Sequence, residues 1–82
     1  MLTIITEDGI FTNPMRVFVH YHGNGHATIW IWPNYPRDIH LSCFPITHEM
    51  PEHKAQALYN RIADQVAAGV TVIDLRKMMN EE

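Results

Sequence analysis

Three histidines lie close together in the stretch RVFVHYHGNGHATIWIW, residues 16–32, and their spacing is compatible with metal chemistry. On a strand, His20 and His22 would project from the same side because they are two residues apart. A glycine-rich hairpin loop would place His26 opposite His22. Three converging imidazoles could hold zinc and leave a fourth position for water. A ligating histidine also needs an acceptor for its other N–H, and no carboxylate lies nearby in the sequence, so we favour polar histidines at the exposed end of a hairpin.

Two further patterns could carry catalysis or bind a metal, and neither is favoured. The segment HEMPEH, residues 48–53, is similar to the zinc-protease pattern H-E-x-x-H, but its second histidine follows five residues on and Pro51 intervenes. Five residues turn a helix by about 500°, whereas the protease pattern needs about 400°. Cys43 alternates with Ile39 and Leu41 on a predicted strand, which favours a buried small side chain over a nucleophile. We therefore expect neither an enzyme nor a cofactor, and the alternative is a zinc-binding protein or small metal-dependent hydrolase built on the three histidines.

Composition narrows the class of protein. The chain has 82 residues, which predicts a single domain over residues 1–82. A domain this short buries roughly 60 to 65% of its unfolded surface, so a protein partner or a second copy would stabilise it. The single cysteine excludes an internal disulfide, and no secretory signal is evident, so we expect a cytoplasmic protein. No apolar run approaches the ~20 residues of a membrane span, so we expect no membrane partner. Nine acidic and six scattered basic residues argue against nucleic acid as a partner.

The elements that would carry these residues begin with a short hairpin. Residues 2–6 are rich in β-branched side chains, and Asp8-Gly9 suits the central positions of a type I′ turn that returns as a strand over 10–12. After the main hairpin, residues 32–38 contain two prolines and predict a loop. Residues 37–44 then predict another strand.

The main hairpin, residues 16–32, sorts its side chains onto two faces. A loop of three residues, 23–25, keeps odd-numbered and even-numbered positions apart, whereas a loop of two would mix them. The odd face is apolar and holds Val17, Val19, Ile29 and Ile31. The even face pairs Arg16 with Trp32, Phe18 with Trp30 and His20 with Thr28.

From residue 46 to residue 69 the apolar period changes from two to about 3.6, which predicts a helix. Its inward stripe is Ala55, Leu58, Ile62 and Val66. Thr47 or the residue before Pro51 can cap its start, and Gly69 stops it. The sequence allows two structures for the segment after the helix. Its β-branched beginning favours a strand, whereas Thr71 followed by Asp74 resembles the capping box of a short helix. We favour the helix. That helix would turn inward Val72, Leu75, Met78 and Met79.

Together these elements predict an α+β fold: a small antiparallel β-sheet of about four strands, one main helix in the C-terminal half packed on one face, and a short C-terminal helix or strand. The helix matches the apolar odd face. Phe18, Trp30 and Trp32 would then lie uncovered, with ~450–750 Å² of ring surface against the ~300–600 Å² patch typical of a monomer. Arg16 would stack on Trp32 in a cation–π contact. We predict that these four residues form an interaction surface.

This surface predicts a non-enzymatic protein–protein interaction domain, a small regulator, inhibitor or adaptor that acts on a larger complex through a protein partner, a second copy or both. Phage-encoded inhibitors of host systems are proteins of this type by analogy. The opposing interpretation is that the first hairpin, the C-terminal segment or the loop over 32–38 folds over the tryptophans as a second small core. A further alternative uses the rings as stacking platforms for single-stranded nucleic acid, which the acidic balance disfavours.

Overall fold

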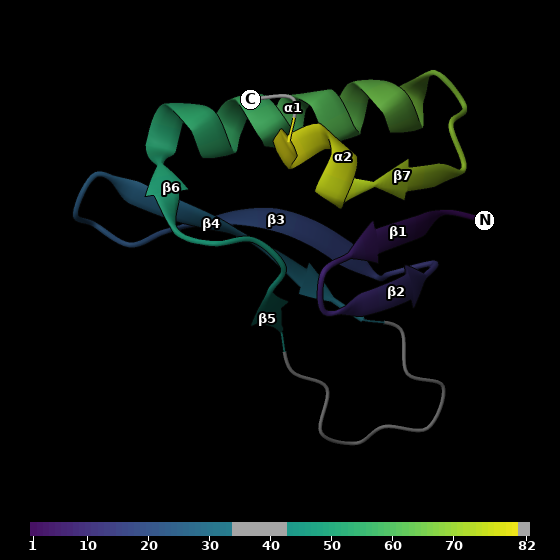
Figure 1. Ribbon diagram of the computed structural model, residues 1–82, viewed down its shortest axis with the longest axis horizontal. Coiled ribbons are helices and arrows are strands. Elements are labelled where there is room, and N and C mark those ends of the chain that lie inside the picture. Colours follow the sequence, from purple (N-terminus) through teal and green to yellow (C-terminus); the bar gives the residue numbers. More distant parts are fainter. Residues whose placement is uncertain (34–42, 81–82) are drawn as a thin grey trace.

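The computed structural model describes residues 1–33 and 43–80, and these residues form an α+β fold (Figure 1). The elements are, in chain order, β1 (Thr3–Thr6), β2 (Gly9–Thr12), β3 (Arg16–Tyr21), β4 (His26–Trp32), β5 (Phe44–Pro45), β6 (Met50–Pro51), α1 (Glu52–Ala67), β7 (Val72–Asp74) and α2 (Leu75–Asn80). Neither of the described helices has the length and apolar composition that a membrane-spanning helix requires.

The larger sheet is built on the β3–β4 hairpin. Its strands follow the order β3-β4-β5, with β6 also paired to β4, and every pairing is antiparallel. Val19 pairs with Ile29, which is the register of a three-residue loop, so the predicted separation of odd from even positions is confirmed. Most of the loop predicted over 32–38 lies outside the described residues, which include Trp32 as the last residue of β4 and Pro33. Most of the strand predicted over 37–44 also lies outside them, and its end begins β5 at Phe44.

A second sheet, in the order β2-β1-β7, stands beside the first. The predicted β1–β2 hairpin is confirmed. Strand β7 joins the other side of β1 in a parallel pairing that places Ile4 beside Ile73. The sequence predicts one antiparallel sheet of about four strands, and this parallel pairing is an addition to it. It joins segments that lie far apart in the sequence, residues 3–5 and 72–74, so no local pattern signals it.

The turn between β1 and β2 differs from the predicted type I′ turn at Asp8-Gly9. Thr6 pairs with Gly9, so Glu7 and Asp8 are the central residues, and neither has a positive φ. The buried hydroxyl of Thr6 decides this geometry. It accepts hydrogen bonds from the backbone N–H groups of Asp8 and Gly9, both at 3.1 Å, and donates to the carbonyl of Gly9 at 3.0 Å.

One apolar core lies where α1 covers the β3–β4 hairpin and the second sheet closes the end (Figure 1). Its buried members are Ile4, Ile29, Ile31, Ile46, Leu58, Ile62, Ile73, Leu75 and Met78. The predicted helical stripe is confirmed at Ala55, Leu58 and Ile62, which are at most 3% exposed. Val66 is 46% exposed, so its predicted inward position is wrong. The last turns of α1 stand over an apolar groove instead of a packed strand.

The start of α1 is not capped as predicted. Pro51 occupies the N-cap position and makes no side-chain capping bond. The Thr47 hydroxyl is used elsewhere, since it accepts the backbone N–H of Ile29 at 3.1 Å. This bond ties the segment before α1 to the edge of β4. The backbone N–H of Glu52 donates to the carbonyl of Gly25 at 3.1 Å, which holds the first turn of the helix beside the hairpin loop.

The C-terminal segment is a strand followed by a helix, so both alternatives for it are partly right. The favoured helix begins at Leu75, and Asp74 takes the capping role because its carboxylate accepts the backbone N–H of Arg76 at 3.1 Å. Leu75 and Met78 are buried as predicted, whereas Val72 is 56% exposed. Parallel pairing with β1 turns Ile73 into the core and therefore turns Val72 outward.

Gly69 ends α1 as predicted. Its φ is +87°, a left-handed conformation. Its N–H donates to the carbonyl of Val66 at 3.1 Å, and the N–H of Val70 donates to that of Gln65 at 3.0 Å. This pair of bonds is a Schellman motif, which satisfies carbonyls that the last helical turn leaves unpaired.

We predict that Gly69→Ala lowers the free energy of unfolding by about 1 to 2 kcal/mol, because a Cβ disfavours the left-handed conformation. Gly69→Asn should lose less, since asparagine tolerates that conformation. Urea unfolding of the three proteins measures the difference. Equal losses for alanine and asparagine would show that the backbone conformation at this position does not limit stability.

Candidate protein-binding site

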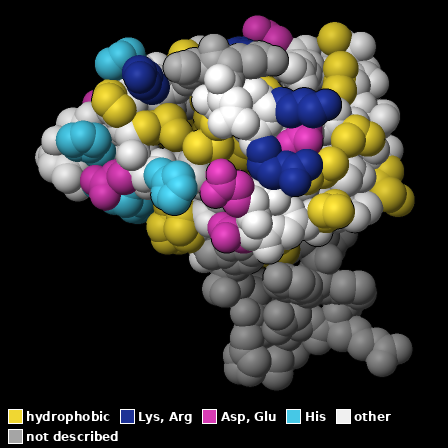
Figure 2. Space-filling model, viewed as in Figure 1, with side chains coloured by type: hydrophobic (Ala, Val, Ile, Leu, Met, Phe, Trp, Pro, Cys, Tyr) yellow, Lys and Arg dark blue, Asp and Glu magenta, His cyan; other side chains and the backbone are white. Residues whose placement is uncertain are grey.

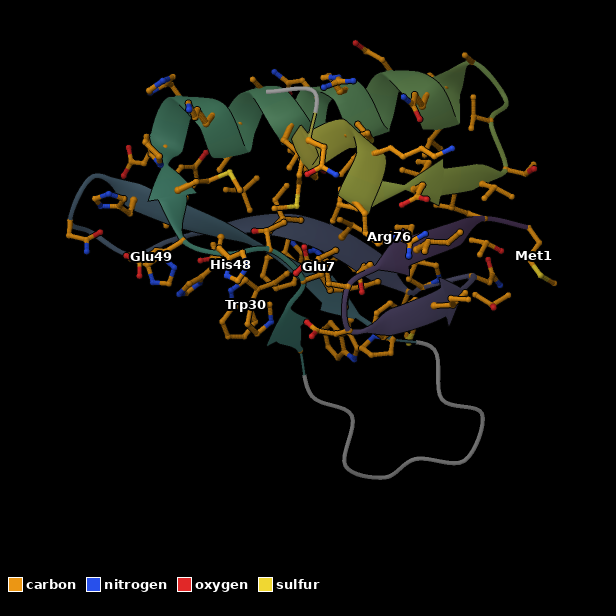
Figure 3. The ribbon with its side chains drawn as sticks, in the orientation of Figure 1. Met1, Glu7, Trp30, His48, Glu49 and Arg76 are labelled. Carbon is orange, nitrogen blue, oxygen red and sulfur yellow. The ribbon has the colours of Figure 1, made fainter. Side chains whose placement is uncertain are left out.

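The even face of the β3–β4 hairpin carries a row of stacked side chains. The Arg16 guanidinium lies 5.1 Å from the centre of the Phe18 ring, and Phe18 lies 6.4 Å from Trp30. The row continues to His20, whose ring centre is 5.0 Å from that of Trp30. Figure 3 shows Trp30 on the side of the hairpin away from α1. The structure therefore joins three of the four predicted residues, Arg16, Phe18 and Trp30, in one row. Arg16 stacks on Phe18, two residues along its own strand, where Trp32, its cross-strand pair, was expected.

This aromatic row is less open than the sequence predicts. Phe18, Trp30 and Trp32 are all half-buried. The indole Nε1 atoms of both tryptophans are buried, and neither has a hydrogen-bond partner within the described part of the chain. A buried donor without a partner costs roughly 1 to 3 kcal/mol. The row thus already belongs partly to the packing of this chain, and it offers a partner less apolar surface than three uncovered rings would.

The three histidines at the end of the hairpin do not converge on one point. The rings of His20 and His22 meet edge to face at 5.1 Å, and His22 Nε2 is hydrogen-bonded to the Thr28 hydroxyl at 2.5 Å. His26 faces His22 through the backbone, where the N–H of His22 donates to its carbonyl at 3.0 Å. Among residues 1–33 and 43–80, no group of three or more His, Cys, Asp or Glu side chains is arranged to hold a metal ion. Figure 2 shows histidines (cyan) spread over the end of the molecule that holds the hairpin loop.

An apolar groove of about 390 Å³ lies between the beginning of β3 and the C-terminal half of α1. Its lining residues are Leu2, Pro14, Met15, Arg16, Val17, Tyr59, Ile62, Ala63, Val66 and Ala67. Arg16 is the one charged residue among them. Grooves with mostly apolar walls and few polar groups are the usual form of a binding site.

The groove exists because the helix presents small side chains to it. Ala63 and Ala67 are four residues apart, so they share one face of α1, and both are exposed. Neither has an atom beyond Cβ to fill the space toward β3. On either side of this hollow, Met15 is 59% exposed and Val66 46% exposed. Sequence reasoning missed this site; the alanine pair beside the apolar stripe was its only local signal.

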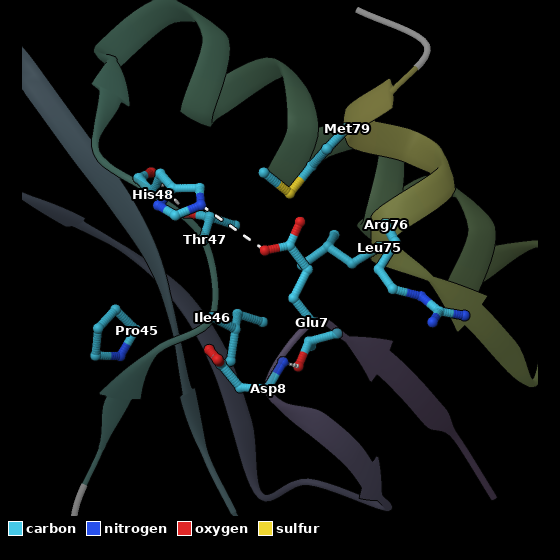
Figure 4. A pocket seen from close by; sticks show the side chains of 10 residues that line it. Glu7, Asp8, Pro45, Ile46, Thr47, His48, Leu75, Arg76 and Met79 are labelled. Carbon is cyan, nitrogen blue, oxygen red and sulfur yellow. Dashed lines mark hydrogen bonds and ion pairs between the residues drawn. The ribbon is translucent and has the colours of Figure 1, made fainter.

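A smaller and more polar pocket of about 150 Å³ lies between the β1–β2 turn and α2 (Figure 4). The Glu7 carboxylate points into it toward His48, with 3.8 Å between Oε2 and Nε2. Both side chains are largely exposed, at 67% and 83%, so this ion pair contributes little energy. The stronger pair is beside it: Arg76 donates to both oxygens of Asp74, at 3.0 and 2.9 Å.

No family model, curated protein or solved structure matches this chain. The choice between the aromatic row, the polar pocket and the groove therefore depends on geometry alone. The groove combines the most exposed apolar side chains with the largest apolar hollow of the three.

We predict that Trp30→Phe lowers the free energy of unfolding by less than about 1 kcal/mol, because it keeps a packed ring and removes the unpaired N–H. Trp30→Ala should cost roughly 3 kcal/mol, since it removes a ring that packs on Phe18 and His20. Denaturant unfolding of both variants tests the structural role of the row. If both variants lose only a small and similar free energy of unfolding, the row does not contribute to the core and is an open binding surface.

The Asp74–Arg76 pair predicts a pH effect. Hydrogen bonds from the Arg76 side chain lower the pKa of Asp74 from 3.8 to about 2. A carboxyl with a lower pKa in the folded state stabilises the fold while it is ionised, so this contribution is present above pH ~4 and is lost as the pH falls toward about 2.

Asp74→Asn keeps a capping side chain but cannot titrate, so its free energy of unfolding should fall less steeply between pH ~4 and pH ~2 than that of the parent chain. The matched control is Asp64→Asn, which changes an exposed acid on α1 and should leave the slope unchanged. The idea fails if both variants keep the parent slope.

Proposed function

We propose that this chain is a non-enzymatic protein-binding domain that docks an apolar segment of another protein in the groove between β3 and α1. The observation that carries this proposal is the exposed apolar lining of the groove, with Met15 at 59% and Val66 at 46% exposure on its two sides. Burial of apolar surface contributes about 25 cal/mol per Å², so covering these exposed side chains favours association.

The composition of the lining supports binding over catalysis. Apart from Arg16 and the Tyr59 hydroxyl, the groove presents no ionisable side chain, and it contains no pair of groups that could transfer a proton. Met15 is flexible and polarisable, which lets one surface adapt to the shape of an apolar partner. A small domain that acts through one such groove suits a regulator, an inhibitor or an adaptor of a larger complex.

The test fills the groove without disturbing the core. Ala63→Phe puts a ring into the hollow from an exposed position, so it should abolish binding of peptides selected on the parent chain from a random library while the melting temperature stays within a few degrees. Ala57→Phe is the matched control, because Ala57 is an exposed alanine of the same helix outside the groove lining.

Titration followed by NMR measures both variants and locates the contact. Peptide binding should shift the backbone signals of Met15, Val17 and Val66 in the parent chain and in Ala57→Phe. If Ala63→Phe binds the selected peptides as tightly as Ala57→Phe does, the groove is not the binding site.

A further inference from the structure

Strand β3 is an edge of the larger sheet. The strand order β3-β4-β5 gives β3 one neighbour, and no described strand pairs with its other side. The strand is six residues long, RVFVHY, and contains no proline and no acidic residue. Edge strands that natural proteins leave unused are usually short, charged or interrupted by proline, because a regular apolar edge is a template for another strand.

The direction of the backbone groups of β3 follows from the hydrogen bonds around the hairpin. The N–H of His22 donates to the carbonyl of His26, so even-numbered positions of β3 turn their backbone groups toward β4. The far side of β4 agrees. There the N–H of Ile29 donates to the Thr47 hydroxyl, and its carbonyl accepts the N–H of Ile46 at 2.8 Å, so odd-numbered positions of β4 point away from β3.

The N–H and C=O groups of Val17, Val19 and Tyr21 therefore point away from β4, along the free edge. No described residue forms a backbone hydrogen bond to them. They are a row of donors and acceptors in the spacing that a second strand would match.

The groove lies along this same edge. Its β3 wall is Met15, Arg16 and Val17, and its other wall is α1. A strand added to the sheet would lie ~4.8 Å beyond β3, in the space that the small side chains of Ala63 and Ala67 leave beside the helix. Its side chains on the same face as Val17 and Val19 would point toward α1 and fill the hollow.

We propose that the partner enters as an extended strand that pairs with the free edge of β3 and places alternate apolar side chains in the groove. This inference rests on the proposed function and specifies its mode. It combines two observations that are independent of each other: unpaired backbone groups along one edge, and an apolar hollow beside them. A helical partner would fill the hollow but leave the backbone groups of β3 unused.

The positive charge of Arg16, the one charged residue of the groove lining, indicates which charge the partner carries. Arg16 is exposed, its guanidinium is held over the Phe18 ring, and it forms no ion pair with a carboxylate in the described part of the chain. A partner strand with an acidic side chain or a terminal carboxylate at this end would satisfy it.

A second copy of this chain satisfies Arg16 less well. Two β3 strands paired antiparallel around a two-fold axis at Phe18 would place Arg16 opposite His20 of the second copy, and an axis at Val19 would place it opposite His22. Neither histidine offers a negative charge. Charge complementarity thus favours a different protein over self-association.

The experiment selects linear peptides from a random library on the parent chain and reads the period of their apolar residues. A period of two with an acidic residue beside it supports the inference, and a period near 3.6 overturns it. N-methylation of a selected peptide at alternate backbone positions should weaken binding roughly tenfold at the positions that bond to β3 and hardly at all at the positions between them, because only the first set loses a hydrogen bond. Equal effects at both sets overturn the strand mode.

Variants of the chain provide the reciprocal measurement. Val19→Pro removes an outward N–H without removing a bond to β4, so it should weaken peptide binding roughly tenfold, whereas the isosteric Val19→Thr keeps that N–H and should bind nearly as the parent does. Arg16→Glu should weaken binding of the acidic peptides roughly two- to fivefold, and Arg16→Lys should weaken it less. If Val19→Pro does not fold, the N-methylated peptides still decide the mode.

The results separate this inference from the proposed function. Loss of binding in Ala63→Phe with no discrimination between N-methylated positions keeps the groove as a site and rejects the added strand. Binding that Ala63→Phe leaves intact rejects the groove itself. If sedimentation shows that the parent chain is a dimer and that Val19→Pro is a monomer, the edge of β3 binds a second copy. That result rejects a different protein as its occupant.

Discussion

The alternation of side chains along the β3–β4 hairpin is the constraint on which the rest of this structure depends. Three loop residues set the parity of the two strands, and a loop of two would place half of the apolar residues on the wrong face. With this parity, Val17, Ile29 and Ile31 meet the helix, while the aromatic row lies on the opposite face. The same alternation orients the backbone, so that odd-numbered positions of β3 present their N–H and C=O groups to its free edge.

The groove arises from a mismatch between two well-formed elements. Helix α1 covers the middle of the hairpin with Leu58 and Ile62. Toward its C-terminus the helix lines the groove with Ala63, Val66 and Ala67, and the two alanines leave the space beside β3 open. The helix and the strand are both regular there, but both continue beyond the region in which their side chains pack against each other. Because one wall of the hollow is an edge strand, apolar burial and backbone pairing become available to the same partner segment.

Hairpin register, the helix and its glycine stop could be predicted because each depends on interactions between neighbours in sequence. The interaction surface was harder to predict. Parity placed Arg16, Phe18, Trp30 and Trp32 on one face, but their exposure depends on everything that packs against them, and the rings are half-buried. Histidine geometry met a similar limit: strand spacing set His20 and His22 on one side, but no sequence pattern indicates the hydrogen bond between His22 Nε2 and the Thr28 hydroxyl.

The sequence by itself determined which side chains share a face, because strand and helix periods are properties of the local backbone. It also determined where α1 ends, since glycine adopts the left-handed conformation of Gly69 without strain. Only the tertiary structure decided that β7 pairs with β1, that Val66 remains exposed and that an apolar groove follows the free edge of β3. These outcomes depend on the distances between elements far apart in the chain, and those distances are set by the packing of the whole core.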